Sequence, residues 1–512
     1  MSDFFDDENV AKSEDTNAEE TQEVKVIPKK KLLPKIIAGL LCVAVLVGGT
    51  FAVIKLIPEK EEENTSSGFK TVEVLSLDGD KVSSVLVSNE NGEFNFSKVT
   101  KDDTNTWTLD GIDNDLLSSD KISSVVNGAF SIEAIRKITE KTEEQCGIAN
   151  SNLYAKITKD DGSVVMVTFG DNSPDNSGCY LKLSDGDIFL VEDSVKTAFV
   201  FDSLYFAAAD MISAVDSDGL DDYFSDGKLT TLDTLTVSGK NYPTPLVITT
   251  NTDKSFSEYI PYKITSPQEH YADKIDGIFS VFSDGISADG AYSFDVSDTE
   301  IAKFGLNNPD LTLTIKLGSK SFSRDFKLQE DGSYAAITTG GKFIYKVSDT
   351  GITEIANADA TKYYSSIICL FSIDKLDSFG ITAEGKTYDF GIKKFEANKE
   401  KTEGVDSEDP YEITYGGKKI DCSSFQNLYK YVLTFGCFDF TTGETDKSST
   451  VSLAFRFTDG DLVTVDFEKA GDTKYQYSIN GRPMGKIQSS KIDKLVKYTK
   501  KLVNGEKISE LN

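Results

Sequence analysis

The sequence predicts an α+β fold, with an N-terminal single transmembrane helix followed by tandem repeats of antiparallel β-sheet with packed helices. Three observations predict this class. One apolar run without charge lies near the N-terminus, hairpin-like alternating stretches recur at three places along the chain, and amphipathic helical stretches lie between them.

The predicted membrane span comes first. Residues 36–54 read IIAGLLCVAVLVGGTFAVI, 19 residues without a charge, and at ~1.5 Å per residue they approach the ~30 Å hydrocarbon core. Lysines at 29, 30, 31 and 35 precede the run and glutamates follow it, so the positive-inside rule places the N-terminus in the cytoplasm and the C-terminal bulk outside. The long acidic leader, the missing cleavage site and the mid-span position of Cys42 favour an uncleaved anchor over a signal peptide or a lipoprotein. We therefore predict a single-pass protein of the cell membrane that contacts lipid through residues 36–57.

The flanks of this span and the overall charge exclude several functions. Residues 1–35 are acidic with few hydrophobic side chains, which predicts a disordered cytoplasmic tail, and residues 58–68 read as a solvated linker. The net charge of -30 disfavours nucleic acid as a partner. The chain has one histidine, so the commonest general base and metal ligand is nearly absent, and we predict no catalytic, metal-binding or cofactor-binding residues.

Three stretches predict the hairpins that open each repeat. They are VSSVLVSNENGEFNF from Val82, LDTLTVSGKNYPTPLVI from Leu232 and LDSFGITAEGKTYDFGI from Leu376. The third contains GITAEGKT, residues 380–387, which matches the pattern of a phosphate-binding loop. Such a loop needs a helix after it, whereas TYDFGIKKF continues the alternation of a strand. We therefore predict a hairpin turn and no nucleotide.

Helices and further hairpins complete each repeat. Apolar residues at helical spacing predict helices over 118–130 and 423–436, and a closing helix begins at residue 489. Asp-Gly and Asn-Gly pairs predict tight turns between the later strands. The resulting repeat boundaries are 69–218, 219–375 and a divergent third copy at 376–512.

A short motif aligns the first two copies residue by residue. CGIANSNLYAKI begins at residue 146 and FGLNNPDLTLTI at residue 304, an offset of 304 − 146 = 158. The motif reads as a loop that leads into a strand, which favours a structural role. Its matched residues are Gly147, Ile148, Asn150, Gly305, Leu306, Asn308 and Pro309.

These features resemble a known bacterial family of unknown function, DUF4340. The resemblance rests on the N-terminal anchor, a segment led by Trp107, a helix, FGLNNP at 304–309 and the GSYAAI…FIYKV strand pair. The first copy has Cys146 and Ser151 where the second has Phe304 and Pro309, and the third copy lacks the motif. The resemblance implies an envelope protein with no assigned chemistry, and a permease or ATPase of an ABC-type transporter as its membrane partner.

Other motifs are better explained by structure than by chemistry. His270 reads as a lone surface histidine, and Ser118 to Lys121 as a helix cap rather than a catalytic S-x-x-K. DSDGLDD at 216–222 hints at calcium, but the loop pattern would need acids where Ala214 and Ser225 stand, which favours a linker turn. GDNSPDNSG, with Asn172, Asp175 and Asn176, reads as a solvated loop that could bind a ligand. The five cysteines outside the span read as buried free thiols.

Three functions remain open at this point. The first is a non-enzymatic extracytoplasmic interaction module, accessory to an ABC-type transporter. The second is a binder of cell-wall polysaccharide or peptide, which exposed aromatic clusters on a sheet would favour. The third is a hydrolase using acidic residues, which would need a deep cleft holding two carboxylates ~5 to 9 Å apart.

Overall fold

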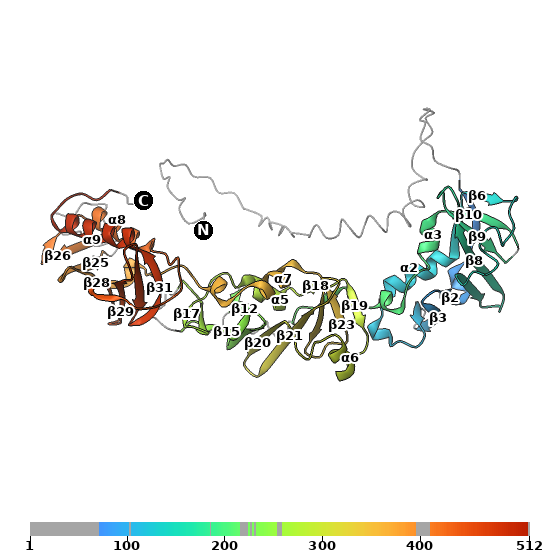
Figure 1. Ribbon diagram of the computed structural model, residues 1–512, viewed down its shortest axis with the longest axis horizontal. Helices are drawn as coiled ribbons and strands as arrows, with labels where there is room; N and C mark the ends of the chain where they lie inside the picture. Colours follow the sequence, from blue (N-terminus) through green and yellow to red (C-terminus); the bar gives the residue numbers. More distant parts are fainter. Residues whose placement is uncertain are drawn as a thin grey trace, which may run out of the picture. The chain divides into compact units, whose positions relative to one another are not determined.

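The structure is a computed structural model, and it describes residues 71–101, 104–184, 186–215, 224–225, 228–229, 232–252, 259–395 and 410–509 (Figure 1). Strands hold 45% of these residues and helices 21%. The predicted α+β class is therefore wrong, because the chain is mostly antiparallel β-sheet. The helices of the described residues are short, and the longest of them, α9 (Ser489–Val503), has 15 residues.

The predicted transmembrane helix is not among the elements that the structure shows. Within the described ranges, no helix is both long and apolar enough to cross a membrane. The predicted span at 36–57 lies outside these ranges, as do the acidic tail at 1–35 and the linker at 58–68.

The first large sheet has eight strands in the order β4-β3-β2-β7-β8-β9-β10-β6, and a separate pair joins β1 to β5. Its helices are α2 (Ser119–Phe130) and α3 (Asp193–Thr197), with 3-10 turns η1 (Gly79–Lys81), η2 (Asn114–Leu116) and η3 (Ser203–Phe206). The strands are β1 (Val72–Ser76), β2 (Val82–Asn89), β3 (Gly92–Lys101), β4 (Thr104–Leu109), β5 (Ser131–Ala134), β6 (Arg136–Ile138), β7 (Tyr154–Lys159), β8 (Val164–Asn172), β9 (Cys179–Leu183) and β10 (Ile188–Val191).

The second large sheet has nine strands in the order β17-β16-β15-β14-β20-β21-β22-β23-β19. Its helices are α5 (Asp276–Ser283), α6 (Asp298–Lys303) and α7 (Thr350–Asn357), and η5 (Ala360–Tyr363) follows. The strands are β14 (Thr234–Gly239), β15 (Tyr242–Thr250), β16 (Tyr262–Ser266), β17 (His270–Tyr271), β19 (Gly290–Ser293), β20 (Leu311–Leu317), β21 (Lys320–Leu328), β22 (Tyr334–Thr338) and β23 (Ile344–Val347). Two small pairs join β11 (Met211–Ile212) to β18 (Ile286–Ser287) and β12 (Phe224–Ser225) to β13 (Lys228–Leu229).

The third large sheet has eight strands in the order β27-β26-β25-β24-β28-β29-β30-β31. Its helices are α8 (Cys422–Leu433) and α9 (Ser489–Val503), and η6 (Ile373–Lys375) precedes it. The strands are β24 (Leu376–Ala383), β25 (Lys386–Lys394), β26 (Tyr411–Tyr415), β27 (Lys418–Lys419), β28 (Asp446–Phe457), β29 (Leu462–Lys469), β30 (Lys474–Ile479) and β31 (Arg482–Gln488).

The three large sheets share one order of connections. Each begins with a hairpin (β2–β3, β14–β15 or β24–β25), continues into a third strand (β4, β16 or β26), and then forms a helix (α2, α5 or α8). The chain then returns to the open side of the hairpin, where β7, β20 or β28 pairs antiparallel with the hairpin's first strand. Three more strands follow in order, and a closing helix (α3, α7 or α9) comes after the last. One large sheet thus lies within each of the three predicted repeat ranges.

Alternating apolar residues build the core of each sheet. In the third sheet, Leu453 and Phe455 of β28 face the same side as Val463 and Val465 of β29, and all four are 2% exposed or less. Phe425 of α8 belongs to the same buried cluster. Removing this apolar surface from water is the main stabilising contribution, and it fixes the register because a one-residue slip would turn every one of these side chains outward.

Two linkers join the sheets in the same way. After the first sheet, Ala207 pairs with Leu117 just before α2, and β11 then pairs with β18, which follows α5 of the second sheet. After the second sheet, Tyr364 pairs with Ala272 just before α5, and the chain then pairs through Ile367 with Gly436, which follows α8 of the third sheet. In the first sheet, the segment that follows α2 is β5, and it pairs with β1. This pair occupies the position that the linkers occupy after α5 and α8 in the other two sheets.

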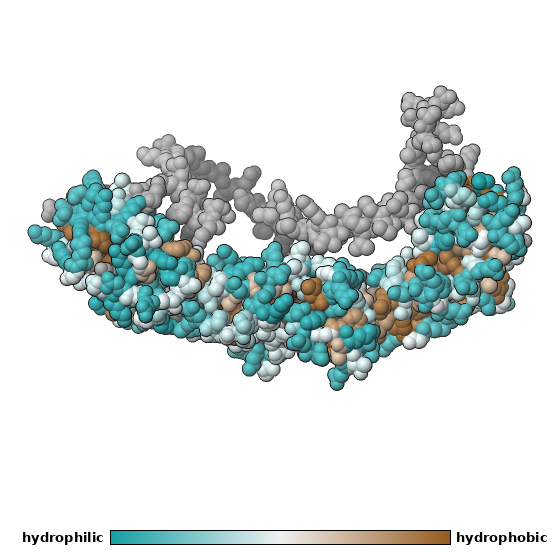
Figure 2. All heavy atoms as spheres, viewed as in Figure 1, coloured by the Kyte–Doolittle hydropathy of each residue, from teal (hydrophilic) through white to brown (hydrophobic). Residues whose placement is uncertain are grey.

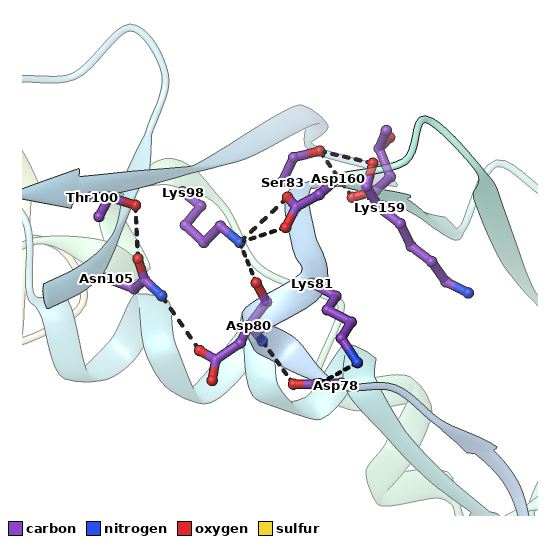
Figure 3. A network of polar contacts seen from close by, with 10 residues as sticks. Asp78, Asp80, Lys81, Ser83, Lys98, Thr100, Asn105, Lys159 and Asp160 are labelled. Carbon is purple, nitrogen blue, oxygen red and sulfur yellow. Dashed lines mark hydrogen bonds and ion pairs between the residues drawn. The ribbon is translucent and has the colours of Figure 1, made fainter. Parts of the chain in front are cut away.

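An aspartate fixes the lead-in to the first and third sheets. Before β2, the Lys98 ammonium donates to the Asp80 carbonyl at 2.8 Å, and Asn105 donates to the Asp80 carboxylate at 3.3 Å (Figure 3). Before β24, the Asp374 carboxylate accepts the Tyr411 hydroxyl at 2.6 Å. These contacts tie each lead-in to the strands of its own sheet.

Candidate functional site

A cleft of about 790 Å³ lies in the third sheet. It lies between the β24–β25 turn, the start of β28, the start of β30 and helix α9. Tyr475, 8% exposed, contributes an aromatic side chain to its lining. The other lining residues are Glu384, Gly385, Ser448, Thr450, Val451, Asp493, Val496, Lys497 and Lys500.

Charges of both signs surround this cleft. The Lys500 ammonium contacts both carboxylate oxygens of Glu384, at 2.8 and 2.6 Å, although both side chains are largely exposed and such a pair adds little stability. Burial, and then the nearby charge of Asp493, raise the pKa of the Tyr475 hydroxyl. The cleft therefore offers hydrogen-bond donors, acceptors and an aromatic ring, which suits a polar ligand such as a sugar or a peptide.

The phosphate-loop pattern at 380–387 forms one wall of this cleft. Residues 380–383 end strand β24, Glu384 and Gly385 form a two-residue turn with φ of 52° and 74°, and Lys386 begins β25. The predicted hairpin and the strand after it are confirmed. The turn has no helix behind it to direct amide groups at a phosphate, and the Lys386 ammonium instead lies 4.7 Å from the ring centre of Tyr388.

The residues of the repeated motif end a helical turn and lead into a strand. Leu306 N–H donates to the Ile301 carbonyl at 3.0 Å, and Ile148 N–H donates to the Glu143 carbonyl at 2.9 Å, so both copies make the same bond five residues back. Such a bond caps a helical turn when a residue of positive φ stands before the donor. The remaining motif residues fit this structural role: Gly147 and Gly305 have φ of 68° and 72°, Ile148 and Leu306 are buried, and Asn150, Asn308 and Pro309 lie in the turn before β7 or β20.

His270 does not lie on the surface, and that prediction is wrong. It is fully buried in β17, where its Nε2 lies 3.2 Å from the Met484 carbonyl of the third sheet. Its ring stacks on Tyr364 at 4.6 Å and meets Phe440 edge-on at 5.0 Å. Burial lowers the pKa of His270 to about 4. A single histidine gives no sequence signal for burial, because its partners come from segments distant along the chain.

The remaining candidates have structural explanations where the structure describes them. Ser118 Oγ accepts the Lys121 N–H at 3.4 Å and caps α2, as predicted. In the 172–178 loop, Ser173 and Ser177 donate to Asp175 and lower the pKa of that carboxyl. Cys146, Cys179, Cys369, Cys422 and Cys437 are buried and form no disulfide in the described part of the chain, as predicted. The acidic stretch at 216–222 and Cys42 lie outside the described residues.

The cleft residues were missed by sequence reasoning for a similar reason. The turn at 384–385, the start of β28 and α9 are far apart in the sequence. Only the turn lies in a recognised pattern, and that pattern points to a phosphate rather than to this cleft. In the described ranges, no group of three or more histidine, cysteine, aspartate or glutamate side chains could hold a metal ion.

Comparison of the chain with protein-family models, with curated proteins and with solved structures found no match. The class that the fold itself defines, over the described residues, is a chain of three large antiparallel β-sheets with the same connections, joined by equivalent linkers.

Proposed function

We propose that this chain is a non-enzymatic interaction module, anchored in the cell membrane by residues 36–57 and acting outside it. Its proposed partner is a membrane protein, namely the permease or ATPase of an ABC-type transporter. The anchor prediction supports the location, and the resemblance to the DUF4340 family supports the partner.

The observation that carries this proposal is the equivalent construction of the two linkers. Each linker pairs first with its own sheet and then with the next one, through Leu117 and β18 for the first linker, and through Ala272 and Gly436 for the second. Arrays of similar units, each in contact with its neighbour, commonly present extended binding surfaces. We therefore infer that the sheets act together as a surface rather than as separate enzymes.

The side of the sheets opposite the apolar core offers polar groups for such contacts. Thr312 donates to Asp325 at 2.6 Å and Thr314 lies 3.2 Å from Ser323 across β20 and β21. The face in Figure 2 is mostly hydrophilic, and its largest hydrophobic area lies around α2. An interface between separately folded proteins is about as apolar as the rest of the protein surface, so a mostly hydrophilic face is compatible with such a contact.

The test is affinity isolation of the tagged full chain from gently solubilised native membranes, read by mass spectrometry. Recovery of a permease and its ATPase in fixed ratio to the chain supports the proposal. Recovery of the chain alone contradicts the transporter assignment.

The cleft in the third sheet specifically favours a second candidate function, the binding of cell-wall polysaccharide or peptide. Val496 is half-buried in its lining, so Val496→Trp should fill the cleft and abolish binding of soluble wall fragments. Lys418→Ala, at the far edge of the same sheet, is the matched control. A hydrolase is less supported, because the cleft leaves the carboxylates of Glu384 and Asp493 exposed to water.

A further inference from the structure

A buried arginine interrupts the apolar inner side of β21 in the second sheet. Phe322, Arg324 and Phe326 face the same way, and Arg324 is 4% exposed. Burial lowers the pKa of Arg324 to about 10, so the side chain stays charged at neutral pH. Burying a charge is costly unless an opposite charge or hydrogen bonds compensate for it.

The other two sheets show that the fold does not need a charge at this position. Equivalent positions can be found by starting two residues before the last residue of the first hairpin strand and following the paired residues across the next two strands. By this route Arg324 corresponds to Val167 in the first sheet and to Val465 in the third. Both valines are fully buried. In the first sheet Val87 pairs with Ala155, which pairs with Val167. In the second sheet Val237 pairs with Leu313, which pairs with Arg324. In the third sheet Ile381 pairs with Leu453, which pairs with Val465.

The next strand repeats the difference. Arg324 pairs with Thr338 in the second sheet. At the equivalent place, Val167 pairs with Leu183 in the first sheet and Val465 pairs with Ile479 in the third. Two adjacent inner positions are therefore polar in the second sheet alone. Departures from a fold's own pattern are expected at functional sites.

The contacts of Arg324 leave its charge without a carboxylate partner in the described part of the chain. Its guanidinium donates to the Ser213 carbonyl at 2.6 Å and to the Val281 carbonyl near the end of α5. Its central carbon lies 5.2 Å from the ring centre of Phe282. A guanidinium has five N–H donors, and these two bonds leave donors for a further acceptor.

Arg324 lines a cavity of about 400 Å³. The first linker forms one side of this cavity, including Ser213 and Val215. The β22–β23 turn forms another, with Thr338, Thr339, Gly340, Gly341 and Lys342. Gly340 has φ of 70°. The Lys342 side chain is 55% exposed, and its ammonium lies 3.5 Å from the Asp115 carboxylate.

We propose that this cavity binds one phosphate or carboxylate group of a ligand. The Arg324 fork matches the paired oxygens of such a group. Thr338 supplies a hydroxyl, and Lys342 adds a second positive charge at the rim. The site is separate from the cleft of the third sheet, and it holds whether or not the partner is a transporter.

The test titrates the detergent-solubilised full chain with inorganic phosphate and with malonate, using sodium chloride at matched ionic strength as the reference. Calorimetry and thermal unfolding are the readouts. We expect either anion to bind and to raise Tm beyond the effect of chloride. Tighter binding of phosphate identifies a phosphoryl ligand, and tighter binding of malonate identifies a carboxylate ligand. A response to both anions that is no larger than the response to chloride overturns the proposal.

Variants locate the binding. Arg324→Met should remove the anion response. Thr338→Val and Lys342→Ala, which leave Arg324 in place, should each weaken affinity about 3- to 10-fold with unfolding in chloride unchanged. Lys316→Ala, on the neighbouring strand and outside the cavity, is the matched control. Wild-type affinity in both Thr338→Val and Lys342→Ala overturns the proposal. A second result would also overturn the proposal, namely anion binding that is absent in wild type and appears only after Asp216 and Asp218 are changed to asparagine. In that case an aspartate of the chain itself would balance the charge of Arg324.

Discussion

At the scale of single residues, His270 couples the second sheet to the third through one unionised imidazole. Its Nε2 contacts the Met484 carbonyl, while Nδ1 is buried and has no hydrogen-bond partner among the described residues. The neighbouring Glu269 carboxylate accepts from Arg482 of the third sheet at 2.5 Å and from Lys263 at 3.2 Å. Burial would remove water from a charged His270 imidazole, so protonation of His270 is unfavourable in the folded chain.

We predict that His270 makes the chain less stable in mild acid. Its pKa is about 4 when folded, against an ordinary value of 6.5. The unfolded chain therefore binds more protons between these values, and stability falls as pH drops through 6.5 and levels off near 4. The loss is about 3 kcal/mol at most. Urea unfolding across this pH range should show that the free energy of unfolding falls with pH more steeply in wild type than in His270→Gln. Parallel pH profiles for the two proteins would contradict this account.

We also predict unequal costs at the two motif glycines. Alanine at either position is strained by the positive φ, which costs about 1 to 2 kcal/mol. A Cβ on Gly147 would overlap the Asp171 carboxylate, whereas on Gly305 it would meet the Lys327 side chain at 3.2 Å, which can move. Gly147→Ala should therefore lower the free energy of unfolding more than Gly305→Ala. Equal losses in urea denaturation would argue against the close contact.

At the scale of elements, local patterns predict hairpins and helices better than they predict what those elements contact. The turn at 384–385 and helices α2, α8 and α9 follow from alternation, helical spacing and caps. The linker pairings, the burial of His270 and the cleft could not be predicted, because each joins segments distant in the sequence. The overall class was also predicted wrongly, since helix signals stand out locally, whereas strands hold 45% of the described residues and helices only 21%.

The linkers should be as sensitive to truncation as the cores. Ile212 of the first linker is 2% exposed, whereas Met211 beside it is 52% exposed. Ile212→Ala should cost about 2 to 5 kcal/mol of unfolding free energy because it leaves a cavity, and Met211→Ala should cost about 0.5 kcal/mol or less. Chemical denaturation distinguishes the two. A mild effect of Ile212→Ala would mean that the first linker is not part of the folded core.

The β24–β25 turn should not act as a phosphate-binding loop. We expect ATP with magnesium to leave Tm unchanged in wild type and in Lys386→Ala, because the turn leads into a strand. ATP hydrolysis by the purified full chain that disappears in Lys386→Ala would contradict this.

At the scale of the whole molecule, the proposed function depends on which side of the membrane holds the sheets. Protease added to intact cells should degrade residues 71–512 and spare a tag at the N-terminus, since the lysine excess before residue 36 favours a cytoplasmic N-terminus. Loss of the N-terminal tag with the sheets protected would show the opposite orientation.

One measurement tests the central claim most directly, that the sheets contact a membrane partner from outside. Intact cells are treated with a membrane-impermeant, lysine-reactive cross-linker, and the tagged chain is isolated and its cross-links are mapped by mass spectrometry. The account predicts cross-links between lysines of residues 71–512 and an integral membrane protein, with none from Lys12 or Lys25 of the N-terminal tail. Cross-links from the tail, or links only within the chain, would contradict it.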